Sequence, residues 1–433
     1  MSIFSRGLVA AMEDETTAAE LAIGDTGADS AEADLVEATD ISADVEAGTA
    51  EIEQASADAD TLERIATTAE QSEADGGLDP VAAEVAEIAV EAIYARLGIT
   101  YSSYPALESF SGRTGRKRAT QIAVEDIKET VKKIWAAIVN AFQKIVDFVK
   151  NFFAKIFDSN RKLLARINAL EMRAKNAKSE PVGKVSGSGI VKALDADSSA
   201  GILHAVVAAP NELKTVVEFA GQTIADLKGL TSDIAQSAPK NQSFMETSKA
   251  ITSLYAEAKK FAETMPKSDL IGKRLDIKFN PSDSDKKSMV DSIKDFGISI
   301  KDTVKNAVSG EKVEVDVANL NEIKRILSAS EKLVQGNLAM KTVVSGFEVG
   351  IRAAVEASKK IAEQTPDGDD KSAVVEDSRI AQRLITSIGN NSTKLVTAAG
   401  KLGIEIAKAG IDYCERNLDT VGNKVEESEK KKD

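Results

Sequence analysis

The sequence has very few of the residues that build metal sites and disulfides. Its 433 residues include a single cysteine, Cys414, and a single histidine, His204. One cysteine excludes a disulfide within the chain, and a zinc site made of Cys and His needs about four ligands. His204 lies in an apolar run, so we interpret it as a packing residue rather than a general base. We therefore expect no catalytic residues, no metal site and no cofactor.

Aromatic residues and long apolar runs are scarce as well. Aromatics make up 4% of the chain and hydrophobic residues 43%, so Ile, Val, Leu and Ala must form the core. Sequences rich in Ala, Lys and Glu favour helix over sheet. In the most apolar predicted helix, the longest uncharged stretch is residues 134–143, far shorter than the roughly 20 residues of a membrane span. No secretory signal is apparent, because an acidic run follows residues 1–12 at once. We expect a mainly α protein that is made soluble in the cytoplasm.

Lysine is absent from residues 1–116, and the charge is divided unevenly along the chain. Residues 1–108 hold 25 Asp or Glu and three Arg, a net charge of −22, whereas residues 109–433 carry +8. A segment this acidic, rich in Ala and poor in aromatics, is not expected to bury enough apolar surface to offset its ordering entropy. We therefore predict that residues 13–79 are disordered or loosely helical. Two interpretations stay open: a solubilising tail, or a pro-segment that masks a basic body until it is removed.

Local patterns predict short elements on both sides of this acidic stretch. Residues 1–12 fit a short amphipathic helix, with Ile3, Phe4, Leu8 and Met12 on one side. Residues 80–98 fit a helix with Pro in its first turn and Gly as its C-terminal cap. Residues 101–115 have no apolar period, which is typical of a linker, and they separate the two charge regimes.

The strongest periodic signal predicts a long helix over residues 120–158. Apolar residues recur every three or four positions in two adjacent rows, a face wider than a two-stranded coiled-coil seam. At 1.5 Å per residue such a helix would be about 58 Å long. Two interpretations stay open for this helix. It packs in the core or in an oligomer interface, or it binds a membrane surface through the apolar face, with lysines on the opposite face. The residues assigned to its apolar face are Ile134, Trp135, Ile138, Phe142, Ile145, Phe148, Phe152, Phe153 and Ile156.

The remainder of the chain is predicted to form a helical body. A basic helix is predicted over residues 161–178, followed by a Gly-rich flexible connector over 181–189. Two alternating segments, 275–279 and 313–317, predict half-buried strands that pair as a small ribbon. Further helices are predicted over residues 210–229, 241–265, 285–308, 318–336, 338–364 and 373–418. The domains expected are 1–108 (acidic, largely disordered), 109–180 (basic linker, long helix and basic helix), 181–420 (helical body) and 421–433 (charged tail).

Polar clusters in the sequence mostly favour turns over binding sites. The connector lacks the Gly and Lys order of a nucleotide-binding loop. The acidic clusters at 283–285 and 367–370 lack the spacing of a calcium loop. One basic cluster is different, because it directly precedes the long helix: it is either a solvated helix lead-in or a contact for phosphates or an acidic partner. Without interleaved aromatics, any nucleic-acid binding would be independent of sequence. This cluster consists of Arg113, Arg116, Lys117 and Arg118.

Residues 100–180 resemble a known family. Residues 104–112 (YPALESFSG) precede the basic stretch, and the helix after it contains IWAAI at 134–138 and a Phe-rich run at 148–157. This stretch of sequence is similar to that of the internal head proteins of giant tailed myophages of the phiKZ type. The resemblance implies a propeptide that directs the protein into the prohead, and a prohead protease that cuts after Glu in a small-x-Glu motif. Carried over, Ala106 is the small residue, Leu107 the middle residue, Glu108 the cut residue and Ser109 the start of the mature protein.

The tripeptide alone is a weak signal, and its context selects Glu108. The Ala106–Glu108 motif lies in the predicted linker, where a protease can bind an extended chain, and at the point where the charge changes sign. Five of the other matches fall in predicted helices, where we expect them to be shielded. They are 89–91, 123–125, 169–171, 346–348 and 354–356.

The resemblance implies a structural, non-enzymatic virion protein packed inside the capsid after synthesis in the host cytoplasm. The partners expected are the prohead protease, the scaffold or inner capsid surface, and packaged DNA, with membrane contact if the protein is ejected into the host. Two other classes stay open. One is a membrane-active protein released from an inhibitory acidic segment, and the other is an enzyme carried in the head. The oligomeric state does not follow from the sequence.

Overall fold

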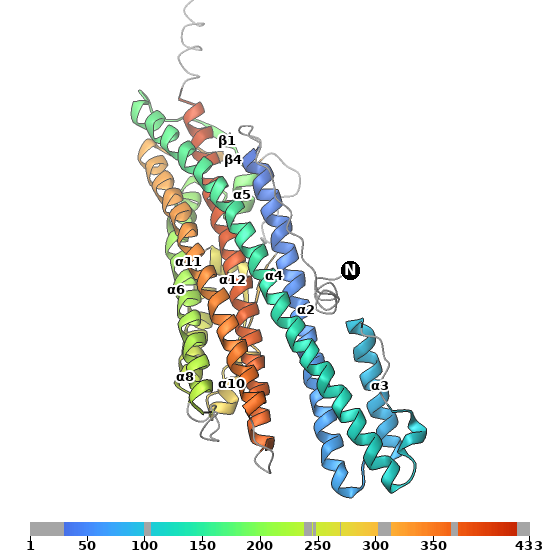
Figure 1. Cartoon of the computed structure of the whole chain (residues 1–433). Coiled ribbons are helices and arrows are strands. Elements are labelled where there is room, and N and C mark those ends of the chain that lie inside the picture. Colours follow the sequence, from blue (N-terminus) through green and yellow to red (C-terminus); the bar gives the residue numbers. More distant parts are fainter. Residues whose placement is uncertain are drawn as a thin grey trace, which may run out of the picture. The chain divides into compact units, whose positions relative to one another are not determined.

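The computed structural model confirms a mainly α protein with a few short strands (Figure 1). Its long helices are α2 (Ser30–Ser72), α4 (Arg113–Asn176), α6 (Ser199–Ser237), α11 (Leu320–Gln364) and α12 (Lys371–Asp419). Shorter helices are α3 (Pro80–Leu97), α5 (Ser188–Leu194), α8 (Lys249–Thr264), α9 (Ile271–Arg274) and α10 (Lys286–Lys294). The structure describes residues 30–98, 105–237, 245, 248–268, 270–301, 313–364 and 371–421. The predicted helix at 1–12, the acidic cluster at 367–370 and the tail from 422 onward lie outside these residues.

The chain forms two compact units, whose boundary lies inside α4. Of the described residues, the first unit contains those of 44–147, and the second contains those of 148–421 together with 30–43. The division expected from the sequence, at 108/109 and 180/181, does not coincide with this boundary. Helix α4 is continuous at residue 147. The helical sequence pattern therefore has no break there that could mark the boundary between the units.

In the first unit, polar contacts join α2, α3 and the turn between them to the N-terminal half of α4. The α3 helix starts at Pro80, where the Asp79 carboxylate accepts the backbone N–H groups of Val81 and Ala82, each at 2.9 Å. It ends at Gly98, which adopts a left-handed conformation at φ 69°. The sequence predicts the proline of the first turn and the Gly98 cap, whereas the Asp79 cap was not predicted.

In its described part the acidic segment is more ordered than the sequence predicts. Of the segment 13–79 predicted to be disordered or loosely helical, residues 13–29 lie outside the described residues, and residues 30–72 form the 43-residue helix α2. The reason is a narrow buried stripe, largely of alanine, that repeats every three or four residues and needs little area per residue to pack. The high net charge of the segment hides this stripe from an inference based on composition. Its members are Val45, Ile52, Ala55, Ala59, Leu62, Ala66 and Ala69.

Helix α4 replaces two predicted helices and most of the predicted basic linker. It runs without interruption through residues 158–161, where the sequence predicts a break. Ser159 and Asn160 are both buried there, and the Asn160 side chain lies 3.5 Å from the Val334 carbonyl oxygen. Packing of these polar residues inside the second unit carries the helix across the interruption.

The second unit is built around α6, α11 and α12, which pack on one another. Helix α8 packs on α6, and α10 packs on α8 and α12. Several helices are longer than predicted: α6 continues through Pro210, and α11 joins the predicted helices 318–336 and 338–364. The predicted helix 285–308 instead stops at Lys294 and is followed by a strand.

Both predicted strands form, but they do not pair with each other. Strand β2 (Leu275–Lys278) pairs antiparallel with β3 (Gly297–Ile300). Strand β4 (Glu314–Asp316) pairs antiparallel with β1 (Lys184–Ser186), with Val185 opposite Val315. The predicted ribbon is therefore wrong in its pairing, because β1 lies in the Gly-rich stretch predicted as a flexible connector and β3 lies in a predicted helix.

Candidate functional site

The predicted cleavage motif lies on an exposed turn between α3 and α4. Ala106, Leu107, Glu108 and Ser109 are all exposed, and the last three belong to the single 3₁₀ turn η2 (Leu107–Phe110). The Ser109 N–H donates to the Ala106 carbonyl at 2.8 Å, and the Ser111 N–H donates to the Glu108 carbonyl at 3.3 Å. Phe110 is fully buried and anchors the turn on its C-terminal side. The motif is thus accessible and held by few backbone hydrogen bonds.

The five motifs named for comparison all lie inside α-helices. Residues 89–91 belong to α3, 123–125 and 169–171 to α4, and 346–348 and 354–356 to α11. A protease that binds an extended chain must unwind several helical hydrogen bonds to reach them, whereas one 3₁₀ turn opens at lower cost. Secondary structure therefore favours Glu108 over these five, in agreement with the context of the motif in the sequence.

The predicted basic cluster forms the first two turns of α4 instead of an unstructured lead-in. Arg113, Lys117 and Arg118 are exposed, and Arg116 is half-buried. The three exposed side chains line an open depression of about 580 Å³, together with Glu73 from the end of α2. Their charges lie at a helix N-terminus, where the positive end of the helix dipole adds to the local potential. This surface can attract phosphate or carboxylate groups.

Acidic side chains of α2 and of the turn after it contact this end of α4, and another acidic side chain of α2 joins this helix to α3. Glu70 forms an ion pair with Lys128, and the Gln121 amide donates to Glu73 at 3.3 Å. Such exposed contacts contribute little each. Within the same unit, the buried Asp58 carboxylate pairs with Arg96 at 2.5 Å and ties α2 to α3.

Two buried polar contacts fix α3 and the preceding turn against α4. The Leu78 N–H donates to the Thr120 hydroxyl at 2.9 Å. The Tyr94 hydroxyl lies 2.6 Å from the Thr130 hydroxyl and donates to Asp126 at 3.2 Å. Burial, with the nearby Asp126 carboxylate, raises the pKa of Tyr94, so its phenol stays protonated and able to donate.

A glycine allows the turn after α2 to approach the α4 backbone. Gly77 has φ 93°, a left-handed conformation that favours glycine. A Cβ atom at this position would lie only 2.7 Å from the carbonyl carbon and oxygen of Arg116. The backbone of the turn therefore lies directly against the basic cluster.

The apolar face of α4 is buried within the protein. Eight of its nine predicted members are buried, and Phe148 is half-buried. Ile134, Trp135, Ile138, Phe142 and Ile145 belong to the first unit, and Phe148, Phe152, Phe153 and Ile156 to the second. The packing supports the interpretation of this face as core. Among the described residues, the structure has no helix that meets the length and hydropathy of a membrane crossing.

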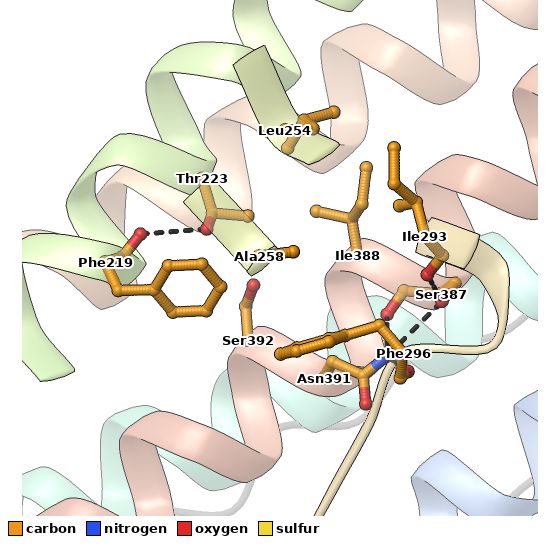
Figure 2. Close-up of a pocket in the computed structure, with 10 residues that line it drawn as sticks. All are labelled: Phe219, Thr223, Leu254, Ala258, Ile293, Phe296, Ser387, Ile388, Asn391 and Ser392. Carbon is orange, nitrogen blue, oxygen red and sulfur yellow. Dashed lines mark hydrogen bonds between the residues drawn. The ribbon is translucent and has the colours of Figure 1, made fainter. Parts of the chain in front are cut away.

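A small cavity in the second unit lies between α6, α8, α10 and α12 (Figure 2). It is lined mainly by apolar groups such as Phe219, Ile293 and Phe296, and its volume of about 30 Å³ leaves room for no more than a few water molecules. Nearby polar groups are already engaged: Asn391 donates to the Phe296 carbonyl at 2.6 Å. This cavity gives no support to a substrate site.

The remaining candidate groups have structural roles or differ from expectation. His204 is exposed on α6, so its interpretation as a packing residue was wrong. Cys414 is fully buried, and burial raises the pKa of its thiol, which makes it unreactive. Asp285 caps α10 by accepting the Ser288 N–H at 2.7 Å, the turn role expected for that cluster. In the described part of the chain, no group of three or more His, Cys, Asp or Glu is placed to hold a metal.

Sequence reasoning missed the contact between the acidic segment and α4. It treated Glu70 and Glu73 as parts of a disordered polyanion, although they lie beside Lys128 and Gln121. The signal that could have found this contact is the alanine-based stripe of α2, which has the period of a packed helix.

Comparison with known proteins identifies a family. A sequence model of the family described as phiKZ-like phage internal head proteins matches residues 31–416, nearly the whole described chain. No protein of curated function matches the chain, and no solved structure matches it.

Proposed function

Because the chain belongs to the phiKZ-like phage internal head proteins, we propose that it is made as a precursor, with residues 1–108 as an acidic leader. Membership makes it a structural protein of the interior of the phage head. In our proposal the leader directs the chain into the assembling prohead, and the prohead protease cuts between Glu108 and Ser109. The basic remainder is then packed with the DNA.

One observation carries this proposal: the small-x-Glu motif that lies at the change of charge sign is also exposed. Glu108 ends the segment of net charge −22, and the residues after it carry +8. It is the one of the six motifs compared that lies outside an α-helix. A cut at this point separates the two charges more completely than a cut at any of the other five.

Electrostatics supports DNA as the partner of the remainder. The cut creates a new ammonium group at Ser109, four residues before the basic cluster that begins at Arg113. Neutralising phosphates with such groups releases counterions, so binding weakens steeply with salt. Since the cluster has no interleaved aromatic residues, binding would be independent of sequence.

Targeting and ejection are further parts of the proposal. Residues 1–12 are the candidate address for the scaffold or the inner capsid surface, and they lie outside the described residues. Ejection with the DNA would bring the protein to the host membrane.

The alternative of a membrane-active protein has weaker support. Its motivation is the broad apolar face of α4, and Trp135 and Phe152 on that face are 8% and 0% exposed. Membrane binding through this face would require the protein to open first.

A pair of glutamate substitutions tests the cleavage proposal. Phage that express Glu108→Gln are expected to contain the full-length chain, because the protease requires Glu at the cut residue. The matched control, Glu91→Gln, changes the same type of tripeptide inside α3 and is expected to leave processing unchanged. Immunoblots of purified particles give the result. Normal processing of Glu108→Gln would refute the assignment of the cleavage site.

A further inference from the structure

The described part of the leader contains a helical hairpin, α2 and α3, whose apolar side is buried. In α2 the buried stripe extends from Val45 to Ala69, and in α3 it continues with Val90, Ile93 and Leu97. The opposite side of α3 is exposed: Val81, Val85 and Ile88 are 61–69% accessible. Burial is thus confined to one side of the hairpin.

The matching surface is the N-terminal half of α4. Ala123, Ile127, Val131 and Ile134 are each at most 6% exposed, and they recur every three or four residues. The buried contacts of Thr120 with Leu78 and of Thr130 with Tyr94 lie along the same part of the helix. The hairpin therefore covers an apolar strip of α4 and fixes its position with polar groups at two levels.

Charge strengthens the same contact. Residues 113–147 carry eight Lys or Arg and four Asp or Glu, whereas residues 44–98 carry fourteen acids and two Arg. Glu70 and Lys128 form an ion pair between these opposite charges. Attraction between the two segments opposes their separation, and salt weakens that attraction.

None of these contacts depends on the peptide bond after Glu108. That bond lies in an exposed turn, outside the buried surface between the hairpin and α4. Its hydrolysis consumes one water molecule and leaves a carboxylate on Glu108 and an ammonium group on Ser109. The apolar strip, the buried hydroxyl contacts and the ion pair are the same before and after this step.

We propose that the leader stays bound to α4 after the chain is cut, so that cleavage and release are separate events. This inference rests on the proposed cleavage at Glu108 and adds a regulatory step to it. The cut chain is a non-covalent complex in which the hairpin still covers the apolar strip and Glu73 still lies beside the basic cluster. Removal of the leader's negative charge from the body requires a second event that displaces the hairpin, such as a new partner that covers the apolar strip.

The consequence for α4 is specific. Without the hairpin, Ile127, Val131 and Ile134 would face water, and an exposed strip of this kind promotes association with another surface. The mature body therefore either keeps its leader or covers this strip with a new partner.

Co-expression of residues 1–108 and residues 109–433 as separate chains tests the inference without any protease. With an affinity tag on the larger chain, we expect both chains to be recovered in equal amounts and to elute together in size-exclusion chromatography. We expect this in 0.15 M and in 1 M NaCl, because screening weakens the ion pairs but leaves the apolar contact. Recovery of the larger chain alone at 0.15 M NaCl would overturn the inference.

Two valine substitutions in the leader identify the surface. Val90→Asp places a charge on the buried side of α3 and is expected to lower recovery of the leader at least about tenfold. Val85→Asp makes the same change on the exposed side, where the valine is 64% accessible, and is expected to leave recovery unchanged. Equal recovery of the two variants would also overturn the inference. The proposed cleavage is judged separately, by the N-terminus found in particles, so the two can fail independently.

Discussion

Helix α2 and the second unit bury different kinds of side chain. In the first unit the α2 stripe is largely alanine, with Ala55, Ala59, Ala66 and Ala69 among its buried members. The second unit has a cluster of rings: Phe152 and Phe153 meet edge to face at 5.1 Å, and Phe219 stacks on Phe261 at 4.2 Å. Buried apolar area is the main source of stability, and alanine provides little of it. The comparison indicates that less buried apolar area stabilises the packing of α2 than stabilises the helices of the second unit.

The largest effect is expected in the second unit, from Phe152→Ala. Phe152 is fully buried against Phe153 and close to Gly400, so truncation leaves a cavity and costs about 3 to 5 kcal/mol of unfolding free energy. Urea denaturation gives the value. The control, Phe157→Ala, truncates a half-buried ring on the same helix and should cost clearly less. Equal losses would show that the fully buried ring of Phe152 contributes no more to stability than the half-buried ring of Phe157.

A smaller effect is expected in the first unit, from Tyr94→Phe. This change removes the hydroxyl that contacts Thr130 and Asp126, and it costs about 1 to 2 kcal/mol because the Thr130 hydroxyl loses its buried partner. Thermal unfolding of the first unit, followed by circular dichroism, measures it. No change in the transition would show that α3 is not fixed to α4 by this contact.

Strong local signals predicted most of the helices and the C-terminal cap of α3. Pro80 and Gly98 each act through their immediate neighbours, so the sequence predicts their roles. The packing of α2 was not predicted, because a stripe of alanine is a weak signal beside so many acidic residues. The strand partners were missed for another reason: Val185 and Val315 are 130 residues apart, and nothing local specifies their pairing.

The candidate site was predicted in part. The motif at Glu108 was located from charge and linker composition, and the structure finds it exposed. The contact of the leader with the basic end of α4 could not be predicted, because it depends on how two helices pack. Cleavage at Glu108 and binding of DNA by the basic cluster stay predictions.

Ion pairs in the two units are expected to contribute about 1 kcal/mol or less each to the unfolding free energy. In the second unit Arg166 contacts Asp412 at 2.7 Å and also pairs with Glu415, so Arg166→Ala should cost about 1 kcal/mol. In the first unit the exposed pair of Lys128 with Glu70 should contribute less than about 0.5 kcal/mol to Lys128→Ala. Urea titrations at low and high salt measure both losses. A larger loss for Lys128→Ala than for Arg166→Ala would reverse the expected order of the two units.

The smallest effect is a dependence on pH in the second unit. Burial raises the pKa of Asp226 above its usual value, so the folded state binds this proton more tightly than the unfolded state. Stability from this group is therefore present at low pH and is lost as pH rises from the unfolded pKa through the raised folded pKa. Asp226→Asn should be more stable than the parent at pH 7, and the difference should shrink as the pH falls towards 4. Chemical denaturation across this range measures it, and a constant difference would contradict the assignment.

The central claim is that the chain is divided at Glu108 during head maturation. Intact-mass spectrometry of the protein from purified phage particles tests it most directly. We predict a body whose first residue is Ser109. A chain that retains residues 1–108, or one that begins at any other residue, would contradict the claim.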